Sequence, residues 1–188
     1  MEDLIKKEII IHKELISNFE NNDIKNITKI AEDIIKTIKN GGYIYLCGNG
    51  GSASDAQHIA GELIGRFKKN RRPLPAIALS SDVSVLTCIG NDFGFDEIFS
   101  RQAEALITNN DILWIFSTSG ESPNIIKTIL VAKEKKAMVI AFIGKTGSTI
   151  EKITDLCLIV NSENTDKIQE VHQLAYHIIC KLIDKKFS

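Results

Sequence analysis

The chain has 188 residues, of which 44% are hydrophobic and 25% are charged, a composition typical of a globular domain. Lys and Arg number 23 and Asp and Glu 24, so the net charge is −1 and binding to nucleic acid by charge alone is not expected. The apolar runs are far shorter than the about 20 residues that cross a bilayer. The N-terminus lacks the apolar segment of a secretory signal, so we expect a cytoplasmic protein without membrane contact.

The first 40 residues are expected to form two helices, because apolar residues recur at intervals of three and four over residues 4–19 and 24–38. Gly41 and Gly42 interrupt this pattern. A β-prone run then follows at residues 43–47 and leads into a glycine-rich loop at residues 48–51.

Beyond this loop, short apolar runs alternate with segments of helical periodicity. Strands are predicted at residues 76–79, 112–116, 138–143 and 156–160. Helices are predicted at residues 52–67, 83–89, 95–107, 124–136, 166–185 and, as one short turn, 148–153. Strands that are apolar throughout need cover on both faces. The pattern therefore predicts an α/β fold: a three-layer αβα sandwich around a mostly parallel five-stranded sheet. We expect one domain over residues 1–188, with residues 1–40 as a helical extension packed on it.

Ligands of open parallel sheets bind beyond the carboxyl ends of the strands. The loop after residue 116 contains four hydroxyl residues around Gly120, and Pro123 occupies the first position of the next helix. The hydroxyl residues are Ser117, Thr118, Ser119 and Ser122. Hydroxyls, a glycine and a helix N-terminus together favour a phosphate site. The alternative is that these residues only cap a helix and fill a turn.

The glycine-rich loop, Gly48-Asn49-Gly50-Gly51-Ser52-Ala53, matches the pattern of dinucleotide-binding loops. The acidic residue that such sites need about 20 positions later is missing, because position 68 is Lys. No nucleotide cofactor is therefore expected. Asn49 and Ser52 would bring an amide and a hydroxyl to the same edge of the sheet.

Two helices carry residues suited to proton or metal chemistry. His58 and Glu62 are four positions apart and hence lie on one helix face; an exposed ion pair is the alternative. In the last helix, Gln169, Gln173 and His177 form a polar row with His172 beside it. The predicted core stripe of that helix is Ile168, Val171, Leu174, Ala175, Ile178, Ile179 and Leu182.

Four stretches, in order over nearly the whole chain, resemble the phosphoheptose isomerases, a family of sugar isomerase (SIS) domains. The first runs from Cys47 to His58 and is followed by Glu62. The others are Gly90-Asn91-Asp92-Phe93-Gly94-Phe95 with Phe99-Ser100-Arg101-Gln102, the loop Ser117-Thr118-Ser119-Gly120 with Ser122, and Ile168-Gln169-Glu170-Val171-His172 with His177. Lys167 departs from the pattern, since the family usually has Arg at that position.

The resemblance implies an aldose–ketose isomerase that converts sedoheptulose 7-phosphate to D-glycero-D-manno-heptose 7-phosphate. This is the first step toward the ADP- or GDP-heptose precursors of bacterial lipopolysaccharide core or capsule. It also implies a cytoplasmic homotetramer with active sites at subunit interfaces.

The resemblance assigns roles to residues as well. Glu62 would be the base at carbon and His177 the acid/base at the oxygens. One zinc ion per subunit would be bound by His58, Glu62, Gln169 and His177. The substrate would contact Asn49, Gly50, Gly51, Ser52, Glu62, Asn91, Asp92, Ser117, Thr118, Ser119, Ser122 and Gln169.

Two other functions remain open at this point. SIS domains also serve as non-catalytic sugar-phosphate sensors or assembly proteins, and other members isomerise shorter sugar phosphates. A pure binding module has no need for a carboxylate and an imidazole facing the sugar, so Glu62 and His177 favour an enzyme.

Overall fold

Five short apolar segments form one parallel β-sheet in the computed structural model, which describes residues 1–188. The strands are β1 (Ile44–Gly48), β2 (Ala76–Ala78), β3 (Ile112–Ser117), β4 (Met138–Ile143) and β5 (Leu156–Ile159). They lie in the order β2-β1-β3-β4-β5, and every neighbouring pair is parallel. The predicted five-stranded parallel sheet is confirmed.

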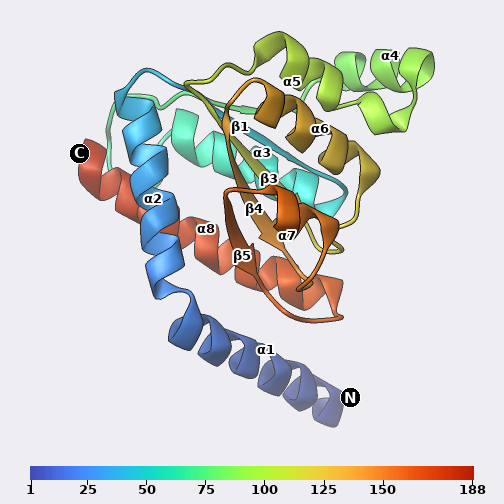
Figure 1. Cartoon of the computed structure of the whole chain (residues 1–188). Helices are drawn as coiled ribbons and strands as arrows, with labels where there is room; N and C mark the ends of the chain where they lie inside the picture. The colour runs from blue at the N-terminus through green and yellow to red at the C-terminus, as the bar shows by residue number, and fades with distance from the viewer.

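Helices cover both faces of this sheet, as shown in Figure 1. One face packs against α2 (Ile24–Lys39), α3 (Gly51–Ile64) and α8 (Thr165–Phe187). The other packs against α4 (Val83–Phe93), α5 (Ser100–Leu106), α6 (Pro123–Glu134) and α7 (Thr149–Ile153). Strand side chains alternate between the two cores: Trp114 and Phe116 belong to the first, Leu113 and Ile115 to the second. The three-layer sandwich is therefore confirmed.

The first helix, α1 (Glu2–Asn22), packs on α2 and α8, and its single buried residue is Phe19 near its C-terminus. Two ion pairs, Glu8–Lys167 and His12–Glu170, also join it to α8. Its N-terminal part extends away from the sheet layers (Figure 1). Four large apolar side chains there are exposed: Leu4, Ile5, Ile9 and Ile10.

Three predicted helices differ from the observed ones. The helix predicted over residues 83–89 continues to Phe93. The helix predicted over residues 52–67 ends at Ile64, because the next residue is Gly65 and glycine favours the end of a helix. The helix predicted over residues 95–107 is divided into the 3₁₀ turn η1 (Phe95–Glu97) and α5. There the Ser100 hydroxyl binds the Glu97 carboxylate, and such local side-chain bonds compete with helix continuation.

The buried face of α8 is rotated from the predicted stripe. Leu174 and Leu182, expected in the core, are 36% and 37% exposed, whereas His172, Tyr176 and Cys180 are buried. Because α8 packs against α2 and α3, it buries a different arc of its surface from the one its apolar residues alone indicate. His172 was placed beside the polar row, where a histidine is either solvated or bonded to a backbone carbonyl, and the structure shows the second: it is buried and lies against the Ile143 carbonyl.

His172 is enclosed by aromatic rings, and its Nε2 lies 3.3 Å from the carbonyl oxygen of Ile143. Burial lowers the pKa of His172 to about 4, although the bond to Ile143 opposes the shift. The unfolded chain takes up a proton on this imidazole near pH 6.5, and the folded chain does so only near pH 4. Stability is therefore lost as the pH falls through this window.

We expect the free energy of unfolding to drop by about 2 kcal/mol from His172 alone between about pH 7 and about pH 5. Urea titrations of the natural protein and of His172→Gln at both pH values measure this. Glutamine keeps a donor for the Ile143 carbonyl but does not titrate, so its pH dependence should be smaller by that amount. Equal pH dependence in both proteins would contradict the prediction.

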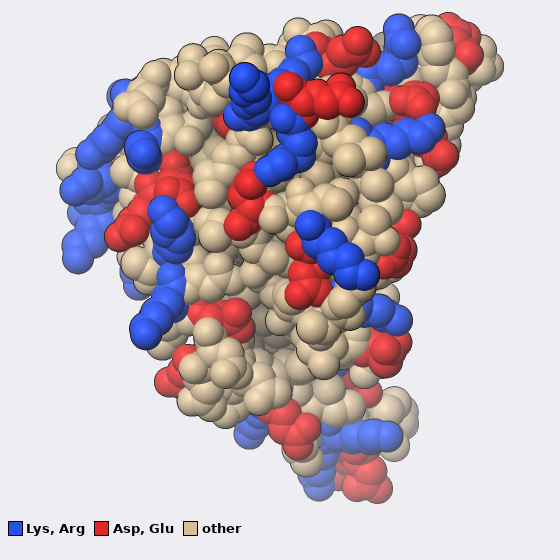
Figure 2. Space-filling view, in the orientation of Figure 1, with Lys and Arg blue, Asp and Glu red and all other residues tan.

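Charged side chains of both signs are interspersed over most of the face seen in Figure 2. This agrees with the nearly balanced totals of basic and acidic residues. Among the helices, none has the combination of length and apolar composition that crossing a lipid bilayer requires.

Candidate active site

A cavity of about 270 Å³ lies where β1 and β3 end side by side. The chain leaves β1 toward α3 on one face of the sheet and leaves β3 toward α6 on the other. This divergence makes the crevice in which open parallel sheets bind ligands. Its lining residues are Asn49, Gly50, Gly51, Ser52, Phe116, Ser117, Thr118, Ser122, Thr165 and Gln169.

Three helices begin at this cavity. Gly51 starts α3, Ser122 precedes α6, and Thr165 starts α8. None of the three has a side-chain hydrogen bond capping its N-terminus. The first amides of a helix lack intrahelical partners and carry partial positive charge, so a cavity at three such ends favours an anion.

In the loop after β3, the hydroxyl groups of Ser117 and Ser122 face each other at this cavity. Ser122 immediately precedes Pro123, as predicted, but its hydroxyl makes no capping bond and lies 3.4 Å from the Ser117 hydroxyl. The Gly120 amide donates to Ser117 at 3.2 Å. Gly120 has φ of +69°, and a Cβ there would collide with Ser148, so only glycine fits this turn. The interpretation that Ser122 serves only as a helix cap is thereby weakened.

The Asn49 amide is fixed by a reciprocal pair of hydrogen bonds. Asn49 Nδ2 donates to Asn124 Oδ1, and Asn124 Nδ2 donates to Asn49 Oδ1, both at 2.9 Å. Asn124 belongs to α6 and is buried. The pair therefore joins the loop after β1 to the helix after β3, and it holds the two sides of the cavity in register.

Gln169 reaches the cavity from α8. A Cβ built on Gly51 would lie 2.6 Å from Gln169 Nε2, so the glutamine amide lies directly against the Gly51 backbone. Gln169 precedes His177 by eight residues, about 12 Å of helix rise. Its role as a fourth metal ligand stays a prediction.

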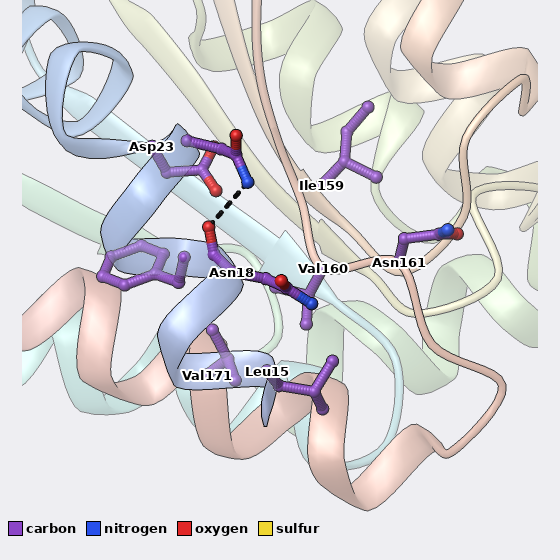
Figure 3. A pocket seen from close by; sticks show the side chains of 9 residues that line it. Leu15, Asn18, Asp23, Ile159, Val160, Asn161 and Val171 are labelled. Atoms are coloured by element: carbon purple, nitrogen blue, oxygen red, sulfur yellow. Dashed lines mark hydrogen bonds between the residues drawn. The ribbon is translucent and has the colours of Figure 1, made fainter. Parts of the chain in front are cut away.

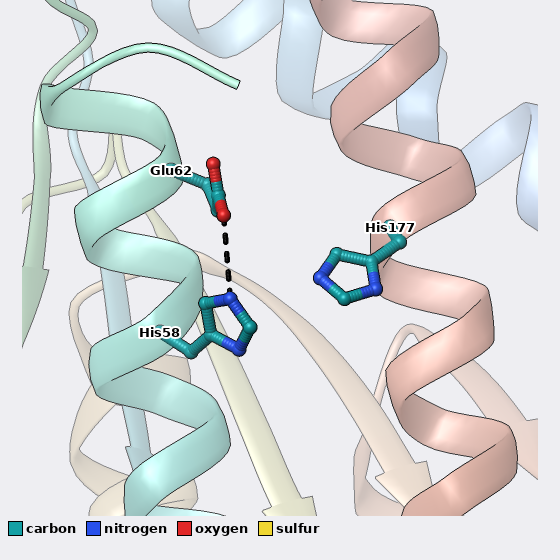
Figure 4. A group of neighbouring side chains, drawn as sticks. All are labelled: His58, Glu62 and His177. Carbon is teal, nitrogen blue, oxygen red and sulfur yellow. Dashed lines mark ion pairs between the residues drawn. The ribbon is translucent and has the colours of Figure 1, made fainter. Parts of the chain in front are cut away.

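His58 and Glu62 on α3 face His177 on α8 (Figure 4). One ligand atom from each side chain lies within 4.8 Å of those of the others. His58 Nε2 is 3.3 Å from Glu62 Oε1. The structure thus brings together the carboxylate and the two imidazoles that the sequence placed on two separate helices. Two histidines and one carboxylate are a donor set found in catalytic zinc sites.

His177 is held between aromatic rings. The Phe67 ring is stacked on it at a centroid distance of 5.7 Å, and the Tyr176 ring lies at 4.7 Å. Burial lowers the pKa of His177, and the nearby His58 lowers it further. The opposing effect of Glu62 is smaller. Neutral His177 is favoured, which suits a group that first accepts a proton.

Two residues behind this cluster were not identified from the sequence. Tyr176 is fully buried, and its hydroxyl lies 3.0 Å from His58 Nδ1 and 3.3 Å from Asp55 Oδ1. Burial raises the pKa of Tyr176, so its hydroxyl keeps its proton, and burial also raises the pKa of Asp55. Asp55 precedes His58 by one turn and Tyr176 precedes His177 directly, but spacing alone does not reveal such a contact. Thr165 in the cavity was missed as well.

Four predicted substrate residues lie outside the cavity lining: Glu62, which belongs to the cluster with His58 and His177, and Asn91, Asp92 and Ser119. Asn91 and Asp92 are exposed on α4, where the Asn91 amide donates to Asp92 at 2.8 Å. Ser119 is exposed at the tip of its loop, and its hydroxyl accepts from the Glu121 amide. A part for these residues in substrate binding stays a prediction.

Another cavity, of about 280 Å³, lies between α1, α8 and the end of β5 (Figure 3). Apolar side chains and asparagine amides form most of its lining, and Asp23 is its one titratable residue. Three helix N-termini meet at the cavity between β1 and β3, and two of these helices, α3 and α8, also carry the cluster of His58, Glu62 and His177. The cavity between β1 and β3 is therefore the better candidate.

Comparisons with known proteins identify the family of this chain. The family model of the SIS domain matches residues 11–144. A phosphoheptose isomerase of Aliarcobacter butzleri is 45% identical over 188 residues, which is 100% of both chains. The structure of a phosphoheptose isomerase from Neisseria gonorrhoeae superimposes with a TM-score of 0.92 at 37% identity, over 98% of both chains. One from Francisella tularensis gives 0.94 at 36% identity, over 97% of both.

The sequence identity extends over nearly the full length of each relative, and the fold is the same. It therefore identifies a family within the SIS domains as well as the SIS fold itself. This chain belongs to the phosphoheptose isomerases of the SIS-domain family.

Proposed function

We propose that this protein is an aldose–ketose isomerase that converts sedoheptulose 7-phosphate to D-glycero-D-manno-heptose 7-phosphate. One observation carries the proposal: the same two helices form the anion cavity and the acid–base cluster. The helix α3 begins at the cavity and carries Glu62, and α8 begins there and carries His177. A sugar phosphate bound by its charged end would extend its opposite end, with the carbonyl, along these helices toward the cluster.

The reaction moves a carbonyl from C2 to C1 by way of an enediol. The Glu62 carboxylate removes a proton from C1, and the electron pair forms the C1–C2 double bond as the C2 oxygen becomes protonated. Glu62 then returns a proton to C2. His177 takes the proton of the C1 hydroxyl and supplies the one at the C2 oxygen, so no external oxidant or base is needed.

His58, Glu62 and His177 fit a divalent ion, and we propose one zinc ion per subunit with Gln169 as a further ligand. The bound ion would polarise the carbonyl of the sugar. A carboxylate that binds the ion tightly is a weaker base, so the proposal requires Glu62 to be released from it during turnover, or the ion to be partly structural.

The proposal also includes a cytoplasmic homotetramer with active sites at subunit interfaces, which supplies precursors for ADP- or GDP-heptose. Exposed Leu4, Ile5, Ile9 and Ile10 on α1 support association, because a second copy would remove these apolar surfaces from water. Asn91 and Asp92 are exposed on α4 and free to contact a sugar held by a neighbouring subunit.

Incubation of the purified protein with sedoheptulose 7-phosphate tests the proposal. Aldose formation is expected, with much slower reaction of pentulose and hexulose phosphates, and treatment with a chelator should lower the rate. If a shorter ketose phosphate reacts faster, it is the substrate and the proposed substrate is wrong. If the protein binds sugar phosphates tightly but converts none of them, it is a binding protein and the proposed enzyme activity is wrong.

Gly51→Ala is expected to impair the anion cavity without unfolding the protein. The added methyl group would displace the Gln169 amide, so we expect kcat/KM to fall about ten-fold, a typical penalty for a change of one methyl group. Gly61→Ala on the same helix is the matched control, because its Cβ meets nothing within 4 Å and helix propensity favours alanine. Steady-state kinetics and thermal unfolding distinguish the two variants. Normal kinetics for Gly51→Ala would show that the close contact between the Gly51 backbone and the Gln169 amide is not needed for activity.

A further inference from the structure

A short hydrogen-bonded chain lies behind His58, on the side away from Glu62. The Tyr176 hydroxyl donates to Asp55 Oδ1 at 3.3 Å and lies 3.0 Å from His58 Nδ1. Asp55 and His58 belong to α3, whereas Tyr176 belongs to α8. The chain thus crosses between the two helices that carry the acid–base cluster.

The direction of these hydrogen bonds follows from the donors available. A hydroxyl has one proton, and an ionised carboxylate only accepts, so the Tyr176 proton points to Asp55. The Tyr176 oxygen must then accept from His58, which requires the imidazole proton to be on Nδ1. A neutral imidazole has one N–H, so Nε2 is left with a free lone pair.

That lone pair faces the cluster. His58 Nε2 and Glu62 Oε1 are 3.3 Å apart, and neither supplies a proton when the imidazole is in this tautomer. Two facing acceptors are repulsive unless a cation lies between them. The arrangement is therefore suited to a divalent ion held jointly by the imidazole and the carboxylate.

We propose that Tyr176 and Asp55 are positioning residues that hold His58 in the Nδ1–H tautomer and aim Nε2 at the ion site. The inference deepens the proposed function and rests on it for the identity of the ion. The partner of a ligating imidazole normally fixes its tautomer and ring orientation in this way. Neither residue touches the substrate in this role.

Packing alone does not account for these polar groups. The Tyr176 ring contacts the rings of His58, His177 and Phe116, and phenylalanine would make the same contacts. Asp55 is only partly exposed, and its Oδ2 is buried without a hydrogen-bond partner. A carboxylate with one oxygen buried and unpaired lowers stability, so its presence calls for a role other than stability.

Tyr176→Phe tests the proposal, because it removes the hydroxyl and keeps the ring. Competition between the protein and a chelator for Zn²⁺ or Co²⁺ should show affinity weakened by about 10- to 100-fold. Tyr45→Phe is the matched control, since the Tyr45 hydroxyl donates to the Leu106 carbonyl away from the cluster. Affinity in that variant should equal that of the natural protein. Unchanged affinity in Tyr176→Phe would overturn the proposal.

Nitrogen NMR of the His58 imidazole gives a second readout in the metal-free protein, at a pH where the ring is neutral. The Nδ1–H tautomer is expected in the natural protein and its loss in Tyr176→Phe. If that variant fails to fold, Asp55→Ala replaces it: the freed Tyr176 hydroxyl would then donate to His58 Nδ1 and favour the Nε2–H tautomer. An Nε2–H tautomer in the natural protein, or no change in either variant, would overturn the proposal.

The two proposals fail in different ways. If the natural protein isomerises sedoheptulose 7-phosphate but takes up no divalent ion, the isomerase proposal stands and the proposal of a bound ion falls. The tautomer measurement still decides whether Tyr176 and Asp55 orient His58. If the tautomer is as expected but no sugar phosphate reacts, the positioning role stands and the isomerase proposal falls.

Discussion

Replacing Glu62 by glutamine should lower kcat by on the order of 10² or more while leaving the fold intact. Glutamine has nearly the same shape but cannot accept a proton from carbon. Exchange of the C1 hydrogen with solvent should therefore disappear, which mass spectrometry of the substrate after incubation in deuterated water measures. This exchange reports the proton-abstraction step itself, whatever step limits turnover.

Glu104→Gln is the control for the loss of one carboxylate, because Glu104 is exposed on α5, on the opposite face of the sheet from α3. Its exchange rate and turnover should equal those of the natural protein. Undiminished exchange in Glu62→Gln would assign the base to another residue. Loss of exchange together with loss of the fold would instead indicate a structural role, so circular dichroism accompanies each measurement.

Asp184→Asn should lower the free energy of unfolding by about 3–5 kcal/mol, because it leaves the Arg71 charge buried and unpaired. The two side chains are 3% and 1% exposed and are joined at 2.7 Å. Burial raises the pKa of Asp184, but the Lys68 and Lys69 amides and Arg71 outweigh it, so the pKa lies below its ordinary value. Arg71 also donates to the Glu62 and Leu63 carbonyls and thereby anchors the end of α3 to α8.

Chemical denaturation at neutral pH measures this loss. The double variant Arg71→Met with Asp184→Leu should recover only part of it: apolar side chains can replace a buried ion pair, but the Lys68 and Lys69 amides and the Glu62 and Leu63 carbonyls lose these hydrogen-bond partners. Glu163→Gln is the control: the pair Lys145–Glu163 has a similar distance, 2.8 Å, but is exposed, so a change of no more than about 1 kcal/mol is expected. A similarly small effect for Asp184→Asn would show that the buried pair contributes little.

Periodicity was sufficient for the elements and their layers. The bounds of strands such as β3 and β4 were predicted to within one residue. A short run that is apolar throughout and lies between polar loops is typical of a strand that is covered on both faces of a parallel sheet. On α8 periodicity was right only in part: Ile168, Val171, Ala175 and Ile179 are buried as predicted, but Leu174 is exposed and His172 is buried. Which arc of a helix is covered depends on its neighbours, here α2 and α3, and these come from distant parts of the chain.

The candidate site divides in the same way. The hydroxyls of Ser117 and Ser122 and the glycine at position 120 lie within one loop, so local sequence predicted an anion site that the cavity between β1 and β3 supports. Spacing placed Glu62 beside His58 on one helix, but it could not place either of them near His177. Nothing in the sequence indicated the hydrogen bonds among Tyr176, Asp55 and His58.

The sequence by itself determined which segments of the chain are strands and helices, which loop favours phosphate, and which isomerase family the chain resembles. Each of these depends on neighbouring residues or on a linear pattern. Only the tertiary structure decided that α3 and α8 bring an acid and two imidazoles together, and that a buried tyrosine orients one of them. Contacts between residues more than 100 positions apart depend on how the helices pack across the sheet, which no local period encodes.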